Sequence, residues 1–531
     1  MKIVVAERIS PRALELFREE PQWQVILPEQ IDGKLAAHLA GADALLVRSA
    51  VQVDAALLEH ADRLRVIGRA GVGVDNIDLE AATKKGIAVM NTPGANAVAV
   101  AEHTLGLMLT LARHLGRAAE STRAGKWEKK SLEGTELRGK TLGVVGLGRV
   151  GMEVARRARS FQMDVVAHDP FVPVTVARDA GVRLEPLETV FRMADYLTLH
   201  VGVTPQTVGM INAATLATMK KGVRLVNCAR GELVNEAALA EALASGQVAG
   251  AALDVFAEEP PRNSPLLALP NVIATPHIAG STREAQEAVG YQVAMQVREY
   301  LKHGVIQNAV NVPSVSYDEY VAMQPYIVLA ERLGSFLAQV SDGPVTEVSV
   351  RFSGGIAEWR TELMRNAAVK GVLRQVAGDE VNVVNAATIA AERGIGVHES
   401  KKKRTGGGAA SVISIMVRAG AGTHLAKGAV LHGNAPRLLA LDDIDIEAPL
   451  AHNLICLRNR DVPGVIGRVG TVLGEHGINI GNFALGRAEC GPDGAPAKAL
   501  AVVQVDQPAP EAVLEELRRM EAIDVVRAVT L

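Results

Sequence analysis

The strongest constraint on the fold is the glycine-rich segment 144–151, with the sequence VVGLGRVG. The apolar run 142–145 leads into it and predicts a strand, and the periodic pattern that follows predicts a helix. A second apolar run, 164–167, ends close to Asp169, which lies 23 residues after Gly146. A strand, a glycine turn, a helix and a second strand that ends in an acid predict a parallel α/β unit with a close backbone turn.

Each glycine of this turn has an expected role. Gly146 allows the tight turn, Gly148 lets a pyrophosphate approach the backbone, and Gly151 lets the helix pack closely on the strand. The helix N-terminus offers N–H groups and partial positive charge to the phosphates. Asp169 would accept hydrogen bonds from ribose hydroxyls and repel a 2′-phosphate, so the pattern predicts a Rossmann-type domain that binds NAD rather than NADP.

Composition excludes several classes of protein. A length of 531 residues suggests three or four domains, at about 150 residues each. The net charge of −3 shows no basic surplus, which argues against nucleic acid as a partner. The chain has no apolar run near the ~18 residues of a membrane span, and it begins like a strand and not like a signal peptide. Three cysteines make no disulfide framework, so we expect a cytoplasmic protein with no membrane partner.

Strand and helix patterns divide the chain into four predicted domains. Residues 1–97 and 282–312 form a discontinuous α/β domain, interrupted by the dinucleotide-binding domain 98–281. Residues 313–450 mix strands and helices in a third domain. Residues 451–531 follow the ferredoxin-like order βαββαβ.

Two segments carry expectations about local structure. The Ala- and Leu-rich segment 97–119 predicts one long helix. The basic, glycine-rich segment 401–408 (KKKRTGGG) predicts a loop, with a phosphate-gripping role as the alternative.

Polar side chains follow three consecutive predicted strands of the dinucleotide-binding domain. Arg230, Glu259 and His277 each come shortly after an apolar run of strand length. Ligands in open α/β sheets bind just outside the carboxyl ends of the strands. We therefore expect the three side chains to face one crevice.

These residue types suit the oxidation of a 2-hydroxy acid. Arg230 can hold the substrate carboxylate with a planar bidentate fork. His277 can remove the hydroxyl proton, and Glu259 can hydrogen-bond the other ring nitrogen and fix the tautomer. Taken singly, each residue is better explained as a surface or capping residue, but their joint placement after a cofactor motif favours catalysis.

The chain resembles the D-isomer-specific 2-hydroxyacid dehydrogenase family. That family has a catalytic Arg, Glu and His in this order, and the spacings of 29 and 18 residues match Arg230, Glu259 and His277. The resemblance covers essentially the whole chain and is most specific to the long-type members with an intervening domain and a C-terminal ACT domain. Four further segments carry it: 47–49, 68–76, 91–96 and 125–129.

This resemblance implies a Rossmann-type doubly wound sheet inserted in a flavodoxin-like substrate-binding domain, then an α+β intervening domain and a ferredoxin-like ACT domain. It implies oxidation of 3-phospho-D-glycerate to 3-phosphohydroxypyruvate by NAD, the first step of phosphorylated L-serine biosynthesis. The residues implied to bind substrate are Arg48, Arg69 and Lys129 for the phosphate, Asn96, Val72 and Gly73 for the carboxylate, and Ser49. Lys126 and Lys130 are the alternatives to Lys129.

The resemblance also implies which residues surround NAD. They are Gly146, Gly148, Arg149, Val150, Gly151, Asp169, Cys228, Ala229, Asp254 and Gly280. Cys228 is expected to offer its backbone and not to act as a nucleophile, because the sequence pairs no base with it. Val72, in place of a Thr, and the order of small residues before Gly280 depart from the common family pattern, but both positions offer chiefly backbone.

The C-terminal pattern resembles an ACT domain that binds an amino acid. By this resemblance Asp461 meets the ammonium group of the ligand, Asn479 hydrogen-bonds it across a domain interface, and L-serine is the implied effector. Serine-responsive relatives carry a His or Tyr near Asn459, and that side chain is missing here. From the residues alone, Asp461 ahead of Pro463 is equally well explained as a helix cap. The family likeness further implies a homodimer or homotetramer.

Two other functions stay open at this stage. The first is a glyoxylate or hydroxypyruvate reductase, against which the phosphate-gripping cations and the two C-terminal domains argue. The second is a non-enzymatic, NAD-sensing binding module. The complete set of Arg230, Glu259 and His277 argues against that alternative.

Overall fold

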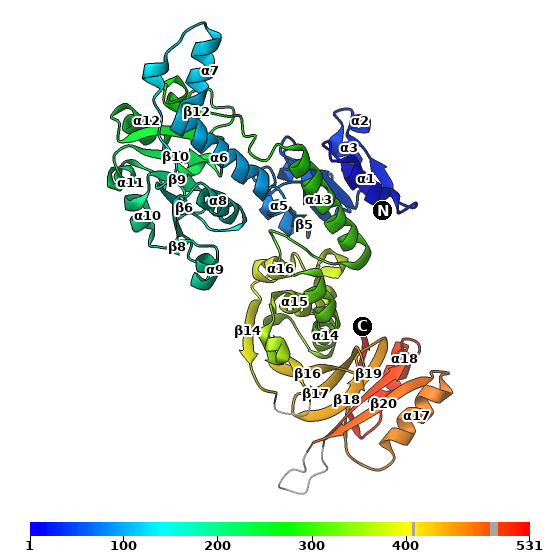
Figure 1. The fold of residues 1–531 in the computed structure, drawn as a ribbon. Helices are drawn as coiled ribbons and strands as arrows, with labels where there is room; N and C mark the ends of the chain where they lie inside the picture. Colours follow the sequence, from blue (N-terminus) through cyan, green and yellow to red (C-terminus); the bar gives the residue numbers. More distant parts are fainter. Residues whose placement is uncertain (406–408, 489–497) are drawn as a thin grey trace.

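The computed structural model describes residues 1–405, 409–488 and 498–531. The described chain forms four β-sheets, which follow one another along the sequence (Figure 1). We refer to each sheet with its helices as the first, second, third and fourth unit. The first two units are parallel α/β structures, and the last two are built on largely antiparallel sheets, so the expected fold class is confirmed.

The first unit has the strand order β2-β1-β3-β4-β5, which is the flavodoxin-like order. Its strands are β1 (Lys2–Val5), β2 (Gln24–Ile26), β3 (Ala44–Val47), β4 (Val66–Arg69) and β5 (Ala88–Met90). Its helices are α1 (Pro11–Arg18), α2 (Pro28–Ile31), α3 (Leu35–Leu39), α4 (Ala55–Glu59), α5 (Leu79–Lys84) and α13 (Arg283–His303). α13 returns from the second unit and packs closely on β4, because a Cβ at Gly68 would lie only 2.7 Å from the Val293 side chain.

The second unit has the order β12-β11-β10-β9-β6-β7-β8, the Rossmann order with one strand added. Its strands are β6 (Thr141–Val145), β7 (Asp164–His168), β8 (Arg183–Leu184), β9 (Tyr196–Leu199), β10 (Val223–Asn227), β11 (Val248–Leu253) and β12 (Val272–Ala274). Its helices are α6 (Ala97–Arg113), α7 (Leu115–Arg123), α8 (Arg149–Ser160), α9 (Val174–Asp179), α10 (Leu187–Met193), α11 (Ala213–Thr218) and α12 (Glu236–Ala244). Three 3₁₀ turns are η1 (Lys129–Leu132), η2 (Gly231–Leu233) and η3 (Pro265–Ala268).

The single helix expected over 97–119 is wrong. α6 ends at Arg113 and α7 begins at Leu115, because His114 between them has a left-handed backbone with φ +55°. Few non-glycine residues adopt this conformation, and nothing in the apolar pattern announces it. α7 stands at the outer end of the second unit in Figure 1, and none of its residues is buried.

The third unit has the order β14-β13-β15-β16-β17-β18. Its strands are β13 (Val345–Gly354), β14 (Gly396–Lys402), β15 (Ser411–Ala419), β16 (Gly422–Leu431), β17 (Ala435–Leu441) and β18 (Ile444–Pro449). Its helices are α14 (Tyr317–Val340), α15 (Glu362–Ala377) and α16 (Ala386–Glu392), with 3₁₀ turns η4 (Gly355–Glu358) and η5 (Gly378–Glu380). The loop expected over 401–408 is partly wrong, since Lys401 and Lys402 pair with β13 as the end of β14, and 406–408 lie outside the described residues.

The fourth unit has the ferredoxin-like order β20-β21-β19-β22, which confirms the expectation. Its strands are β19 (Asn453–Arg460), β20 (Ile480–Arg487), β21 (Lys498–Val505) and β22 (Ile523–Thr530). Its two helices are α17 (Val465–Glu475) and α18 (Glu511–Arg518). The amphipathic helices cover one face of the sheet with apolar side chains such as Val469 and Leu517, which are fully or almost fully buried.

Specific contacts join the units. β18 and β20 lie against each other, and Gly486 leaves no room for a Cβ because the backbone carbonyl of Asp445 occupies that place. Arg458 of β19 donates a hydrogen bond to Asp442, in the turn between β17 and β18. The third unit meets the first where Asn382 Nδ2 donates to the carbonyl oxygen of Gly86, at 2.9 Å.

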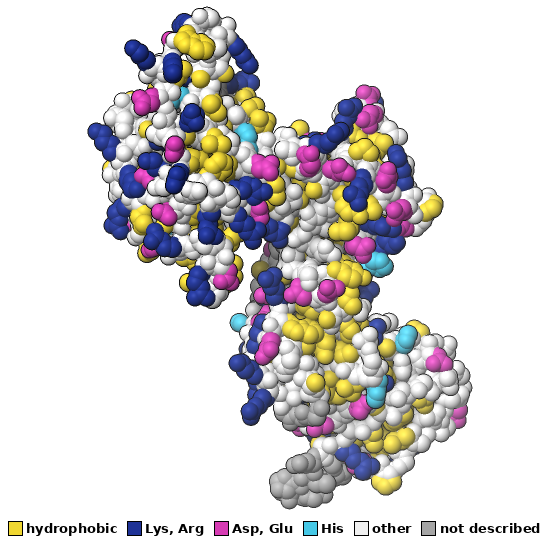
Figure 2. Space-filling model, in the orientation of Figure 1, with side chains coloured by type: hydrophobic (Ala, Val, Ile, Leu, Met, Phe, Trp, Pro, Cys, Tyr) yellow, Lys and Arg dark blue, Asp and Glu magenta, His cyan; other side chains and the backbone are white. Residues whose placement is uncertain are grey.

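Two surveys of the described ranges bear on possible partners. None of the helices there combines the length and the apolarity that crossing a bilayer requires. In the same ranges, no group of three or more His, Cys, Asp and Glu side chains is arranged to hold a metal ion. Acidic and basic side chains are interspersed on the face shown in Figure 2, in keeping with the net charge of −3.

Candidate active site

The glycine turn between β6 and α8 has the geometry of a phosphate-binding loop. Gly146 has a φ of +90°, and a Cβ there would lie 2.5 Å from the carbonyl oxygen of His200. Gly151 brings the first turn of α8 against the carbonyl oxygen of Gly146, where a side chain would collide. By contrast, a Cβ at Gly148 would meet no described atom within 4 Å. The start of α8 is therefore open to an incoming phosphate.

Asp169 lies beside this turn. Its Oδ2 accepts a hydrogen bond from the backbone N–H of Leu147 at 2.8 Å, and its Oδ1 accepts one from Phe171 at 2.9 Å. Arg149 and Val150 open α8, and the Arg149 guanidinium donates to the carbonyl oxygen of Pro93. The start of α8 is thus tied to the loop that follows β5.

Asp254, at the end of β11, organises the chain around His277. Its carbonyl oxygen accepts a hydrogen bond from the His277 N–H at 2.9 Å. Its carboxylate accepts bonds from the backbone N–H groups of Ile278 at 2.9 Å and Ala279 at 2.8 Å. His277 itself has a left-handed backbone with φ +53°, a conformation that persists in a non-glycine residue only when its surroundings impose it.

His103 of α6 is a member of this site that sequence reasoning missed. Its Nε2 lies 3.4 Å from Asp254 Oδ1 and 3.2 Å from Thr275 Oγ1. Burial tends to raise the pKa of Asp254, but the hydrogen bonds from His103, Thr275 and the backbone outweigh burial and hold the pKa below its ordinary value. Asp254 therefore stays charged.

The chain after β10 and the chain after β12 lie near the start of α6. Burial raises the pKa of the Cys228 thiol to about 12, so the thiol is neutral and unsuited to attack. The next residue, Ala229, donates its N–H to Asn227 Oδ1 at 3.0 Å.

A Cβ at Gly280 would lie 2.9 Å from Asn96 Nδ2, and Asn96 Oδ1 is buried with no hydrogen-bond partner among the described residues. That oxygen is thus available to a bound ligand.

His277 and Glu259 form a hydrogen-bonded pair. His277 Nδ1 lies 2.8 Å from Glu259 Oε2, and Glu259 Oε1 accepts a bond from the Phe256 N–H at 3.2 Å. Both side chains, with Thr275, line a cavity of about 360 Å³. Because Glu259 engages Nδ1, the remaining ring nitrogen, Nε2, is the one that can exchange a proton with a ligand.

A cluster of three arginines brings Arg48 and Arg69 of the first unit together with Arg230 of the second. Burial lowers the pKa of Arg69, as do the neighbouring charges of Arg230 and Arg48, while Asp75 and Glu7 act in the opposite direction. Arg69 Nε is buried and has no hydrogen-bond partner among the described residues. Like charges repel in so confined a place, so the cluster is arranged to receive an anion.

Two acids hold the arginine cluster, and sequence reasoning assigned no role to either. Asp75 Oδ2 lies 3.1 Å from Arg230 Nη2. Glu7 accepts hydrogen bonds from the backbone N–H groups of Arg48 at 2.7 Å and Ala50 at 3.1 Å. Asp75 lies within the motif 68–76, but no spacing rule connects it with Arg230.

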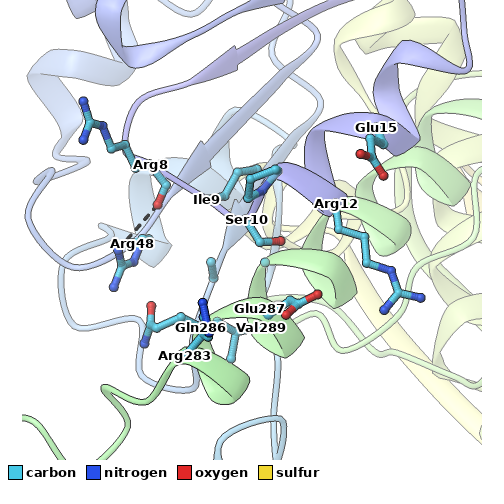
Figure 3. A pocket seen from close by; sticks show the side chains of 13 residues that line it. Arg8, Ile9, Ser10, Arg12, Glu15, Arg48, Arg283, Gln286, Glu287 and Val289 are labelled. Atoms are coloured by element: carbon cyan, nitrogen blue, oxygen red, sulfur yellow. Dashed lines mark hydrogen bonds between the residues drawn. The ribbon is translucent and has the colours of Figure 1, made fainter.

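The cationic surface continues beyond Arg48 into a cavity of about 540 Å³. Arg8, Arg12 and Arg283 line it together with Arg48, at the first turns of α1 and α13. Figure 3 shows Arg48 hydrogen-bonded to the carbonyl oxygen of Arg8, at 3.4 Å. Glu15 and Glu287 also line the cavity, so it borders the arginine cluster but carries charges of both signs.

Some of the expected substrate residues lie apart from the cluster or offer only backbone. Lys129 is exposed and begins η1, which follows α7 at the outer end of the second unit, whereas α1 and α13 belong to the first unit, to the right in Figure 1. Lys126 and Lys130 belong to the same projecting segment.

Val72 is exposed, and its carbonyl oxygen accepts a bond from Asn91 at 2.5 Å. Ser49 is exposed next to Arg48, and Gly73 has no space for a Cβ because the Arg230 guanidinium fills it.

The two expected effector residues have partners within their own chain. Asp461 Oδ2 lies 3.2 Å from Arg487 Nε, and Asn479 Nδ2 donates to Asp506 Oδ2 at 2.8 Å. The alternative in which Asp461 caps the helix is wrong, because the residue at the N-cap of α17 is Gly464, with φ +90°.

Comparison with known proteins matches the second, third and fourth units to described families. The D-isomer specific 2-hydroxyacid dehydrogenase NAD binding domain matches residues 105–279. The D-3-phosphoglycerate dehydrogenase intervening domain matches residues 322–442, and the ACT domain matches residues 452–522. The three matches follow one another in the order that the sequence predicted.

Relatives match along the whole chain. The D-3-phosphoglycerate dehydrogenase of Methanocaldococcus jannaschii is 40% identical over 532 residues, which cover 100% of both chains. The D-3-phosphoglycerate dehydrogenase of Archaeoglobus fulgidus is 41% identical over 525 residues, 98% of each chain. Among solved structures, an NAD-dependent formate dehydrogenase from Staphylococcus aureus in complex with NAD is 30% identical with a TM-score of 0.52, over 59% of this chain and 100% of that one. The chain therefore belongs to the D-3-phosphoglycerate dehydrogenase family, and it is an NAD-dependent oxidoreductase of the D-isomer-specific 2-hydroxyacid type.

Proposed function

We propose that this protein oxidises 3-phospho-D-glycerate to 3-phosphohydroxypyruvate with NAD, the first step of phosphorylated L-serine biosynthesis. The observation that carries this proposal is the cluster of Arg48, Arg69 and Arg230, taken together with the hydrogen-bonded His277–Glu259 pair. The substrate has a carboxylate at one end and a phosphate at the other, so it needs cations on both sides of the carbon that reacts. The full-length relatives that carry the name D-3-phosphoglycerate dehydrogenase support the same substrate.

The second unit fits NAD. The open backbone at Gly148 would take the pyrophosphate, and Asp169 at the tip of β7 would take the ribose hydroxyls. The buried, unpartnered Asn96 Oδ1 beside Gly280 offers an acceptor to a polar group at the inner end of the site. NAD held by these residues would supply the acceptor for the hydride from C2 of the substrate.

The catalytic roles follow from the chemistry of the side chains. Arg230 holds the substrate carboxylate, and Arg48 and Arg69 hold the phosphate. His277 Nε2 takes the hydroxyl proton, because Glu259 occupies Nδ1. Glu259 also stabilises the ring once it is protonated. In the reductive direction the protonated His277 returns the proton to the substrate oxygen.

The arrangement of the sheets supports a division into four domains: 1–97 together with 282–312, then 98–281, 313–450 and 451–531.

We also propose that the protein is a homodimer or homotetramer that pairs through the second unit. The projecting segment after α6 supports this, because Trp127 is 86% exposed and Leu115 is 50% exposed. In such an assembly Lys129, which belongs to this projecting segment, would reach the phosphate site of a second copy. Light scattering should show a smaller assembly for Trp127→Ala than for the parent.

Two regulatory and cellular proposals accompany this function. Asp461 and Asn479 would bind the ammonium group and the polar atoms of L-serine, the amino acid at the end of the pathway.

The free thiols of Cys228 and Cys456 support a reducing, cytoplasmic location.

The decisive experiment follows NADH formation from 3-phosphoglycerate and NAD, with and without L-serine. Turnover that serine suppresses supports both the enzyme and the effector site. Turnover that serine leaves unchanged keeps the enzyme and rejects the effector. If 3-phosphoglycerate gives no turnover but glyoxylate or hydroxypyruvate is reduced by NADH, the substrate proposal is wrong.

A further inference from the structure

The segment that carries Glu259 is held in an unusual way. After β11 the chain runs through residues 255–264 without regular structure before η3 begins, and residues 257–260 are exposed. Beneath this segment lies a cavity of about 480 Å³, lined among others by Glu236, Glu258, Pro261 and Ser264. Packing alone therefore does not set the position of Glu259.

Glu236 holds the segment at both ends. Its Oε1 accepts a hydrogen bond from the backbone N–H of Ala257 at 3.1 Å, and its Oε2 accepts one from the hydroxyl of Ser264. Ala257 and Ser264 flank Glu259 on either side along the chain. Glu236 is itself well fixed, because it begins α12 directly after the N-cap Asn235, whose side chain accepts a bond from α12 at 3.0 Å.

A second contact joins this segment to the neighbouring strand end. Gly231 directly follows Arg230, and a Cβ on Gly231 would collide with the backbone of Phe256 and Ala257. The backbone after β10 thus lies directly against the beginning of the Glu259 segment. Together, Gly231 and Glu236 set the segment between the residue proposed to bind carboxylate and the helix α12.

We propose that Glu236 is a positioning residue for the reaction: by bonding Ala257 and Ser264 it places Glu259 against His277 Nδ1. This inference rests on the proposed roles of Glu259 and His277. Glu236 touches neither of them, so it acts only through the segment. A carboxylate can accept both hydrogen bonds at once, whereas an amide has one acceptor oxygen; with that oxygen on the Ala257 N–H, its NH₂ group can reach Ser264 only by reversing the direction of that bond.

A purely structural explanation of Glu236 is also available. An acid in the first turn of a helix is stabilised by the helix dipole whatever else it contacts. That explanation predicts a loss of stability without a specific loss of turnover. The two explanations therefore give different results in kinetic measurements.

The test compares full-length variants in the oxidation of 3-phosphoglycerate. Glu236→Gln should lower kcat by roughly 10- to 100-fold, because small displacements of catalytic groups have effects of that size. NADH binding, followed by fluorescence, should stay at the parental level. Ser264→Ala removes one of the two bonds and should lower kcat less. Glu241→Gln, an exposed position on the same helix, is the matched control and should behave like the parent.

Combination with Glu259→Gln separates positioning from general stability. If Glu236 acts through Glu259, adding Glu236→Gln to Glu259→Gln lowers kcat no further. A full additional loss in the double variant overturns the inference, as does parental kcat in Glu236→Gln alone. If Glu236→Gln does not fold, Ser264→Ala is compared in the same two backgrounds. Parental kcat in Glu259→Gln would instead reject the proposed role of Glu259, and the inference with it.

Discussion

Asp75 of the first unit and Arg230 of the second form an ion pair in which Asp75 Oδ2 lies 3.1 Å from Arg230 Nη2. The other terminal nitrogen, Arg230 Nη1, donates to the carbonyl oxygen of Ala229 at 2.7 Å. Both ends of the guanidinium fork are therefore engaged. A substrate carboxylate that binds Arg230 through Nη2 therefore competes with Asp75 for that nitrogen.

Asp75→Asn should therefore strengthen substrate binding. Asp75 is largely exposed, and exposed ion pairs contribute up to about 1 kcal/mol, so KM for 3-phosphoglycerate should fall by at most about fivefold. The value of kcat should stay close to that of the parent, because Asp75 takes no part in proton transfer. Initial rates at saturating NAD measure both constants. A rise in KM would mean that Asp75 helps to place the substrate and does not compete with it.

His277→Ala should reduce turnover by about 10²–10⁴-fold, the usual effect of losing a general acid or base. NADH binding should persist, since the contacts proposed for NAD lie at the glycine turn and Asp169. Stopped-flow measurement of the first turnover, combined with NADH fluorescence titration, separates the two effects. A variant that retains near-parental turnover contradicts the role assigned to His277.

Arg69→Ala should raise KM for 3-phosphoglycerate much more than KM for unphosphorylated D-glycerate. The reason is that the buried Arg69 Nε has no partner in the described chain and is proposed to bind the phosphate. Arg18→Ala, an exposed substitution on α1, serves as the control for a general loss of positive charge. Equal effects of Arg69→Ala on both substrates would remove Arg69 from the phosphate site.

Cys228 and Cys456 should resist alkylation in the folded protein. Burial raises the pKa of each thiol from its ordinary value of 9.0 to about 12, so both stay protonated at pH 8. Below about pH 9 these thiols are protonated in both the folded and the unfolded chain, so they leave the free energy of unfolding unchanged. Between about pH 9 and 12 the thiolate forms only in the unfolded chain, so the free energy of unfolding falls as the pH rises. Mass spectrometry after iodoacetamide treatment, with and without denaturant, measures the first effect. Rapid labelling of native Cys228 would show that the site opens.

Arg487→Ala should strengthen any response to L-serine. In the present structure the Arg487 guanidinium lies 3.2 Å from Asp461, where the ammonium group of the effector is proposed to bind. The Arg487 side chain is 66% exposed, so its ion pair with Asp461 is weak. Removing this pair should therefore raise the affinity for L-serine by no more than about fivefold. Calorimetric titration of both proteins with L-serine tests this. An unchanged or weaker affinity would place the effector elsewhere.

The sequence predicts the parts of the fold and site whose chemistry is local. The turn at Gly146 depends on residues that are close together in one short motif. The order of Arg230, Glu259 and His277 depends on a pattern that repeats at the ends of successive strands. The pairing of His277 with Glu259, at 2.8 Å, was expected from the side-chain types alone. These features need little information about the distant parts of the chain.

Features that depend on tertiary contacts could not be predicted in the same way. α14 runs through Pro325, a residue that ordinarily ends a helix, and it persists because much of it is buried between α15 and the third sheet. His103 and Asp75 come from segments far from the residues they contact. The break between α6 and α7 at His114 is likewise signalled by no apolar pattern.

The contact between β18 and β20 has a mechanical consequence. Because Gly486 has no side chain, β20 lies directly against the Asp445 carbonyl, and this close contact joins the third and fourth units into one connected body. The Asn382–Gly86 hydrogen bond then connects that body to the turn before β5, the strand that leads to the loop before Asn96. A contact path therefore runs from the fourth unit to the loop before Asn96, and it involves neither Glu259 nor His277.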